Sequence, residues 1–234
     1  MITRPIPVVL AWSGGKDSTL ALADLRADAR YNVIGGVTAV TPAFDRVSIH
    51  GIRRSVLRAQ SRAIGLPIVE AALESPSSND AYEAAWAAAL GAAAEQFGAF
   101  RHVAYGDLFL EDVRAYRNAQ LARLGLEPVY PLWGRPTHAL ARQFIESGYE
   151  AYLTCVDTTQ LAPSFAGRRY DAELLADLPV SVDPCAERGE FHTLTVAGPV
   201  FAERILVTAG ERVLRDERFQ YCDFSLNGLL RPAK

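Results

Sequence analysis

The sequence of 234 residues contains very little lysine. Of its 24 basic residues only Lys16 and Lys234 are lysines, so arginine supplies nearly all of the positive charge. Arginine does not replace lysine where a compact, mobile ammonium group must reach a phosphate. We therefore expect the one internal lysine to have a specific function.

Cysteine is also scarce, with Cys155, Cys185 and Cys222 far apart and odd in number. This spacing argues against a disulfide framework and against a zinc site of the CxxC type. No apolar run approaches the ~20 residues of a membrane span, and the N-terminus has no signal-peptide pattern. We expect a cytoplasmic protein with no membrane partner.

Strong net charge is absent as well. The formal net charge is −3, and half of the residues are hydrophobic. Such a chain can form a substantial core, and it has no general attraction to nucleic acid or to anionic membranes. We expect an enzyme without a nucleic-acid partner.

Strand-length apolar runs alternate with segments of helical periodicity as far as residue 132. The predicted strands cover residues 7–10, 32–40, 67–72, 101–105 and 128–132, and the predicted helices cover 17–29, 51–64, 79–97 and 112–124. This alternation predicts an α/β fold, a parallel sheet with helices on both faces.

The pattern changes at Trp133. Beyond it we predict a helix at 137–147, a strand at 149–156 and a loosely helical segment at 161–178. Two further strands, at 191–196 and 204–213, are predicted to form a hairpin or a small sheet. We expect a nucleotide-binding domain at 1–132 and a smaller α+β domain at 133–234.

The motif AWSGGKDSTL follows the first predicted strand and opens the first predicted helix. Free backbone N–H groups and the helix dipole make such a turn an anion site. It is not the P-loop of common ATPases, because Leu10 stands where the first glycine should be and Asp17 follows the lysine. The residues expected to contact a nucleotide are Ser13, Gly14, Gly15, Lys16, Asp17 and Ser18.

Within this motif the glycines permit close backbone approach, and Lys16 supplies a point charge. Ser13 and Ser18 can hydrogen-bond phosphate oxygens. Asp17 has two interpretations, since it can cap the helix or place Mg²⁺ through water.

Two other strand ends carry polar residues. His50 precedes a predicted helix and is either near the phosphates or a local hydrogen-bonding residue. Gly106 and Asp107 follow the fourth strand, and Asp107 is a candidate contact for Mg²⁺ or nucleotide. The carboxyl ends of parallel strands share one edge of the sheet, so we expect one nucleotide site there.

A second polar cluster, DPCAERGEFHT, lies in the C-terminal part. Glu190 and His192 share a face of the predicted strand and can do acid–base chemistry, or they form a Glu–His pair in a partly buried turn. Cys185 is either a nucleophile or a small buried residue.

The pattern SGGKDS resembles the PP-loop of ATP pyrophosphatases, which hold the β and γ phosphates and leave the α phosphorus open to attack. Together with RVSIHGIRR, YGDLFLEDVRAYR, VYPLW, DPCAERGEFHT and AGPVF, it resembles the diphthine–ammonia ligase family, particularly its bacterial-type members. The similarity covers nearly the whole chain. One departure is Ala186, at a position where the family signature usually has glycine.

The resemblance implies a Rossmann-like fold and an ATP- and Mg²⁺-dependent, amide-forming reaction. ATP adenylates a carboxylate, pyrophosphate leaves, and ammonia attacks the acyl-adenylate. Lys16 would bind pyrophosphate, Asp107 would place Mg²⁺, the strand carrying Thr38 would border adenine, and Glu190 and His192 would orient the acceptor or ammonia. The implied substrate-binding residues are Cys185, Glu187, Gly189, Glu190 and Thr193.

The acceptor stays open, as a protein residue or a small molecule with a carboxylate. Archaeal and eukaryotic members of the family amidate diphthine on an elongation factor, whereas bacterial-type members belong to organisms expected to lack this modification. Two alternatives remain. One is a tRNA-modifying PP-loop enzyme that uses Cys155 and Cys185, and the other is an ATP-binding sensor without turnover.

Overall fold

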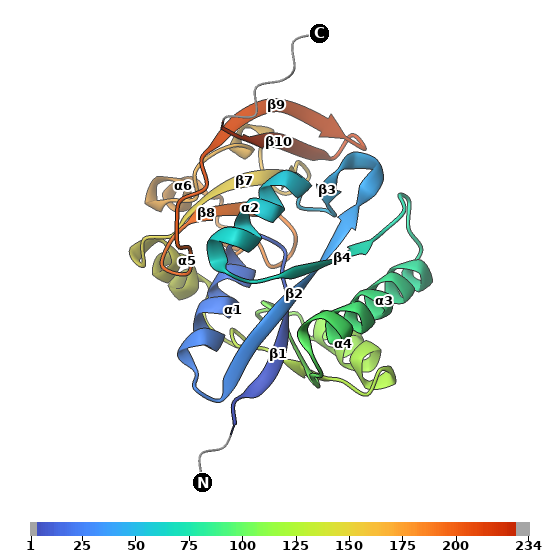
Figure 1. The fold of residues 1–234 in the computed structure, drawn as a ribbon. Coiled ribbons are helices and arrows are strands. Elements are labelled where there is room, and N and C mark those ends of the chain that lie inside the picture. Colours follow the sequence, from blue (N-terminus) through green and yellow to red (C-terminus); the bar gives the residue numbers. More distant parts are fainter. Residues whose placement is uncertain (1–3, 228–234) are drawn as a thin grey trace.

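The computed structural model describes residues 4–227, which form two β-sheets with helices around them (Figure 1). Lys234 lies outside the described residues. The parallel strands of the first sheet follow the order β4-β2-β1-β5-β6. Their bounds are β1 (Ile6–Ala11), β2 (Tyr31–Thr41), β4 (Ile68–Ala72), β5 (His102–Ala104) and β6 (Glu127–Val129). This Rossmann-like order places ligands at the carboxyl ends of the strands.

A sixth strand, β3 (Arg46–Val47), pairs antiparallel with the end of β2. Val40 pairs with β3 on one edge of β2 and with Ala72 of β4 on the other. β1 and β3 both pair with the edge of β2 that faces away from β4. β1 pairs with β2 as far as Val37 and β3 pairs with Val40 and Thr41, so β3 extends the sheet beyond the end of β1. The chain between β3 and the next helix therefore passes close to the carboxyl end of β1.

Helices cover both faces of this sheet, as predicted (Figure 1). α1 (Lys16–Ala27) and α2 (Arg54–Ile64) lie on the face turned toward the second sheet, while α3 (Asn79–Phe97) and α4 (Glu111–Arg123) cover the other. Trp86 and Leu90 of α3 bury their side chains against Val9 and Val37 because they recur at helical spacing.

The second sheet is antiparallel, with the strand order β8-β7-β10-β9. Its strands are β7 (Glu150–Asp157), β8 (Phe191–Ala197), β9 (Val207–Arg215) and β10 (Phe219–Leu226). The helices of this part are α5 (Thr137–Glu146) and α6 (Ala172–Asp177), and short 3₁₀ turns cover Pro42–Phe44 and Pro163–Phe165. The predicted small α+β region is confirmed.

Two details of the prediction are refined by the structure. The loosely helical segment at 161–178 contains a 3₁₀ turn and the six-residue α6. Of the two alternatives for residues 191–196 and 204–213, the small sheet is confirmed and the hairpin is wrong, because β8 and β9 occupy opposite edges of the sheet. β9 pairs instead with β10, which the prediction missed, through a turn whose Asp216 and Glu217 have φ of 50° and 53°. Such turns usually contain Asn-Gly or Asp-Gly, so this one carries no clear sequence signal.

One apolar core joins the α1 face of the first sheet to the second sheet. It includes Leu22 of α1, Leu57 of α2, Phe144 of α5 and Leu194 of β8. Leu132, at the predicted boundary, is fully buried in it. The division at residue 132 stays a prediction. None of the helices found in residues 4–227 combines the length and the apolar character that a membrane span requires.

Candidate nucleotide and acceptor site

The PP-loop, residues Ser13–Ser18, connects the carboxyl end of β1 to the start of α1. Gly14 has φ of 82°, and a Cβ atom there would lie 2.5 Å from Oε1 of Gln60, so this position requires glycine. Within residues 4–227, no acceptor is found for the backbone N–H groups of Gly14, Asp17 and Ser18. Three free donors at a helix N-terminus form a cradle that fits an anion.

The serine hydroxyls and Gly106 complete this cradle. Ser18 Oγ donates to the Gly15 carbonyl at 3.0 Å, and Ser13 Oγ donates to Ser18 Oγ at 3.2 Å. A Cβ atom at Gly106 would lie 2.9 Å from the carbonyl carbon of Asp17. The loop after β5 therefore touches the first turn of α1 only because Gly106 has no side chain.

Three contacts attach the PP-loop to β8 of the second sheet. Thr193 Oγ1 accepts the Lys16 N–H at 3.0 Å, and the Thr195 N–H donates to the Gly14 carbonyl at 2.9 Å. Nε2 of Gln60 donates to the carbonyls of Gly14 and Thr195 at 2.8 and 2.7 Å. Gln60 was not among the predicted site residues. Its signal was a polar residue one helical turn after Val56, on the apolar side of α2.

The Lys16 side chain is 3% exposed and reaches the second half of the chain. Its Nζ donates to Asp17 at 2.8 Å and to the Cys185 carbonyl, while the rings of Tyr170 and Phe191 lie 5.9 and 5.8 Å away. Burial is the largest single influence and lowers the pKa of Lys16, but the charge and hydrogen bond of Asp17 together with Cys185 and Asp183 outweigh it, so the pKa is raised. The ammonium group stays charged at neutral pH.

Cys185 belongs to the signature loop, which we define as Asp183–Glu190. Glu190 is 1% exposed and accepts the N–H groups of Asp183 and Arg188 at 2.9 and 3.0 Å. Asp183 in turn accepts the Glu187 N–H at 3.0 Å. The carboxylates of the loop thus satisfy its own backbone donors. Glu190 does not pair with His192, contrary to one interpretation of the sequence.

Two positions of the signature loop have left-handed backbone. Gly189 has φ of 79°, and Ala186 has φ of 57°. A left-handed residue with a Cβ atom is strained by about 1–2 kcal/mol. Ala186 therefore keeps the conformation that glycine would adopt at the same position, at an energetic cost.

Glu187 connects the signature loop to the segment after β5. Its Oε1 accepts the N–H groups of Leu108 and Phe109 at 2.7 and 3.2 Å. Burial raises the pKa of Glu187 to about 7, although these two hydrogen bonds oppose the shift. The carboxyl group can therefore exist in both protonation states near neutral pH.

Asp107, the candidate Mg²⁺ ligand, forms an ion pair with Arg117 of α4. Its two carboxylate oxygens lie 2.6 Å from Nε and 3.2 Å from a terminal nitrogen of Arg117, whose guanidinium lies 4.3 Å from the Tyr105 ring centre. No group of three or more potential metal ligands occurs in the described part of the chain. As arranged, both oxygens of Asp107 lie against Arg117, although Oδ2 accepts no hydrogen bond from the described residues, and its binding of Mg²⁺ stays a prediction.

His50 and His192 face each other with ring centres 4.5 Å apart. His50 comes from the loop after β3 and His192 from β8. Burial lowers the pKa of His50 to about 4 and that of His192 well below its usual value. Thr193, the neighbour of His192, accepts the Lys16 N–H at 3.0 Å, so the two rings lie near the PP-loop. Both imidazoles are neutral at pH 7.

Family models of known proteins match both halves of this arrangement. Residues 6–125 match the diphthamide synthase N-terminal domain, and residues 136–225 match the diphthamide synthase C-terminal domain. The chain belongs to the diphthamide synthase family. The PP-loop lies in the first matched segment and the signature loop in the second, so Lys16 bridges the two family domains.

Curated relatives carry the name diphthine–ammonia ligase. The zebrafish protein (Danio rerio) is 31% identical over 105 residues, which are 41% of this chain and 40% of the relative. The human protein (Homo sapiens) is 33% identical over 97 residues, 39% of this chain and 36% of the relative. The Schizosaccharomyces pombe protein is 32% identical over 95 residues, which cover 39% of this chain and 16% of the relative. The chain thus matches less than half the length of these relatives.

Two residues that the family resemblance singled out are buried. The Thr38 hydroxyl donates to the Trp12 carbonyl at 2.5 Å, so it supports the strand that leads into the PP-loop. Burial raises the pKa of Cys185 to about 12, and its Sγ donates to the Thr137 carbonyl at 3.3 Å. A thiol in this state is not a nucleophile at neutral pH. Cys185 contributes its backbone carbonyl to the site, through Lys16.

Proposed function

We propose that this member of the diphthamide synthase family is an ATP-dependent ligase that forms AMP and pyrophosphate and joins ammonia to a carboxylate. The observation that carries this proposal is the contact between the PP-loop and the signature loop at Lys16. An anion cradle and a loop rich in carboxylates meet there, and both lie in segments matched by the family models.

In the first step the PP-loop holds the phosphates. The N–H groups of Gly14, Asp17 and Ser18 and the positive end of α1 stabilise the charge that develops on the leaving pyrophosphate. A carboxylate oxygen of the acceptor attacks the α phosphorus, and the bond from this phosphorus to the bridging oxygen of pyrophosphate breaks. Mg²⁺ bound with ATP would neutralise part of the phosphate charge. A role of Lys16 in binding pyrophosphate stays a prediction.

In the second step ammonia attacks the carbonyl carbon of the acyl-adenylate, and the bond to AMP breaks. The nitrogen must lose a proton as the amide forms. His192 is neutral and has a free nitrogen lone pair, so its imidazole is suited to orient ammonia by accepting a hydrogen bond, with His50 packed against it. Its lowered pKa makes it a weak base, so the proton passes to solvent. Glu190 and Glu187 then act as positioning residues, because their oxygens hold the backbone of the signature loop and of the segment after β5.

Of the two alternatives, the thiol-dependent tRNA enzyme has less support. Burial raises the pKa of Cys155 and of Cys185 to about 12, which leaves neither thiol reactive at pH 7. The ATP sensor has the same binding cradle and differs only in turnover. The acceptor, diphthine or another carboxylate, and a cytoplasmic location remain predictions.

The test uses ATP labelled at the α phosphate, incubated with Mg²⁺, ammonium and fractionated cell extract. We expect labelled AMP from the natural protein and at least a ~100-fold lower rate from Lys16→Met, since the contact between the two loops is lost. Arg58→Ala removes an exposed cation from α2 and should leave the rate unchanged. Labelled ADP would contradict the ligase mechanism, and bound but intact ATP in every fraction would favour the sensor.

A further inference from the structure

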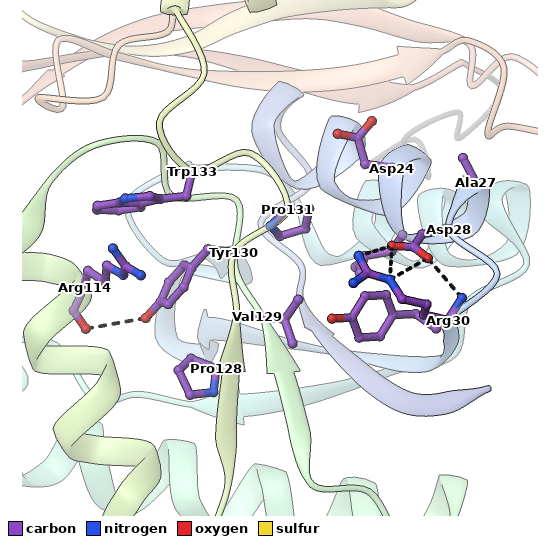
Figure 2. Close-up of a pocket in the computed structure, with 12 residues that line it drawn as sticks. Asp24, Ala27, Asp28, Arg30, Arg114, Pro128, Val129, Tyr130, Pro131 and Trp133 are labelled. Carbon is purple, nitrogen blue, oxygen red and sulfur yellow. Dashed lines mark hydrogen bonds and ion pairs between the residues drawn. The ribbon is translucent and has the colours of Figure 1, made fainter. Parts of the chain in front are cut away.

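A cavity lies away from the PP-loop, between the C-terminal half of α1 and the segment that leaves β6 (Figure 2). Its volume is about 730 Å³. Asp24, on its wall, follows Lys16 by eight residues of α1, which corresponds to about 12 Å along the helix. The cavity is therefore separate from the nucleotide site, and its volume is in the range of pockets that hold small organic ligands.

One wall of the cavity carries an arginine held between aromatic rings. The guanidinium of Arg114 lies 4.4 Å from the ring centre of Trp133 and 5.3 Å from that of Tyr130 (Figure 2). The Tyr130 hydroxyl donates to Asn118 at 2.9 Å, which fixes its ring. Because these contacts restrict both the ring and the guanidinium, the cation is positioned before any ligand arrives.

The opposite wall carries charges that already have partners. Asp28 pairs with Arg30 at 2.6 Å, and Asp24 pairs with Arg135 at 2.6 Å. Arg114 differs, since its guanidinium makes no hydrogen bond within residues 4–227. Its nearest carboxylate, Glu111, is 3.9 Å away and 77% exposed. Arg114 is thus the cation in this cavity whose charge is least compensated.

We propose that this cavity binds a small organic anion with a planar or apolar body. A phosphate or carboxylate of the ligand pairs with the planar fork of the Arg114 guanidinium, which matches either group. The body of the ligand lies against Val129, Pro131 and Leu25, the apolar part of the lining. The proposal is independent of the ligase activity, because the PP-loop contributes no residue to this cavity.

Isothermal titration calorimetry tests the proposal with AMP as the phosphate probe and biphenyl-4-carboxylate as the carboxylate probe. Excess α,β-methylene-ATP is present, so that the nucleotide site is filled. We expect one probe to bind with a stoichiometry of one, and Arg114→Gln to weaken it at least about ten-fold. The matched control Arg123→Gln removes an arginine of the same helix that pairs with Glu83 and does not line the cavity, and it should change the affinity less than about three-fold.

A second variant, Ala27→Trp, fills the cavity from the exposed end of α1 without changing Arg114. It should abolish binding of the same probe, and circular dichroism checks that both variants fold. The probe that binds identifies the anionic group. Binding of neither probe, or an affinity for Arg114→Gln or Ala27→Trp equal to that for the natural protein, would overturn the proposal.

Discussion

The PP-loop and the signature loop meet at Lys16, yet different parts of the molecule stabilise them. Gln60 and Thr195, from α2 and β8, hold the PP-loop at the Gly14 carbonyl. The signature loop is held by its own carboxylates, since Glu190 binds two N–H groups inside the loop. The PP-loop, which neighbouring elements hold, should therefore lose stability when a side-chain atom is added. The signature loop should lose stability when its internal hydrogen bonds are removed. Four predictions test this difference.

The largest difference is expected between two glycine substitutions. Gly14→Ala adds a methyl group 2.5 Å from Gln60 at φ of 82°, and it should destabilise the protein by about 3 kcal/mol or more and weaken ATP binding. Gly189→Ala has similar φ, 79°, but open space around the new atom, so only about 1 kcal/mol is expected. Urea unfolding measures the free energy of unfolding of each variant, and ATP titration measures its affinity for ATP. Equal losses of stability would show that the neighbours of the PP-loop do not constrain it.

Glu190→Gln should have the next largest effect. The amide nitrogen replaces one of the two acceptors that bind the N–H groups of Asp183 and Arg188, which leaves a buried donor unpaired. The expected loss is about 1–3 kcal/mol in the free energy of unfolding. Glu203→Gln, at an exposed position of the same chain, should change it by less than about 0.5 kcal/mol. If both variants behave alike, Glu190 does not organise the loop.

Glu187→Gln should change how stability depends on pH. The pKa of Glu187 is about 7 in the folded protein and 4.5 in its usual range, so the folded state binds more protons between these values. The natural protein therefore loses stability as pH rises from 4.5 through 7. Glutamine does not titrate, so the variant does not lose stability in this way, and its side-chain oxygen still accepts the N–H of Leu108. The Tm of the variant minus that of the natural protein should increase over this window.

The control for this pH series is Glu146→Gln, an exposed substitution in α5. Its Tm difference from the natural protein should stay constant over the same pH range. A constant difference for Glu187→Gln as well would mean that the carboxyl group is not held in its raised-pKa state.

The smallest effect is expected for Ala186→Gly. Glycine removes the strain at φ of 57° but adds freedom to the unfolded chain, so the net gain in stability should be below about 1 kcal/mol. Ala115→Gly, on an exposed face of α4, has no such strain to remove and should lose about 1 kcal/mol. Differential scanning calorimetry should therefore show a gain in stability for Ala186→Gly and a loss for Ala115→Gly. A loss at both positions would argue against strain at Ala186.

Much of the first sheet could be predicted because its signals are local. Each strand is a short apolar run, and the adjoining helices show a helical period that agrees with the faces they bury. β10 was missed since its turn contains Asp216 and Glu217 with left-handed backbone and no glycine. The segment at 161–178 is predicted as loosely helical, and a 3₁₀ turn and α6 form there.

For the candidate site, the residue types were predictable but their partners were not. Asp107 was considered for Mg²⁺, yet Arg117, ten residues later, provides its charge partner. Arg117 and Gln60 were not predicted as site residues, because neither carries a local signal of its partner. Polar residues in a helix indicate a buried contact only when the surrounding fold is known.

The sequence by itself determined the position of the PP-loop, since a strand, two glycines and a helix follow one another within a few residues. Only the tertiary structure decided what Lys16 contacts. The hydrogen bond to the Cys185 carbonyl spans 169 residues and that from the Lys16 N–H to Thr193 spans 177. Local spacing restricts nearby backbone geometry, but contacts over such separations depend on how the two sheets pack around their common core.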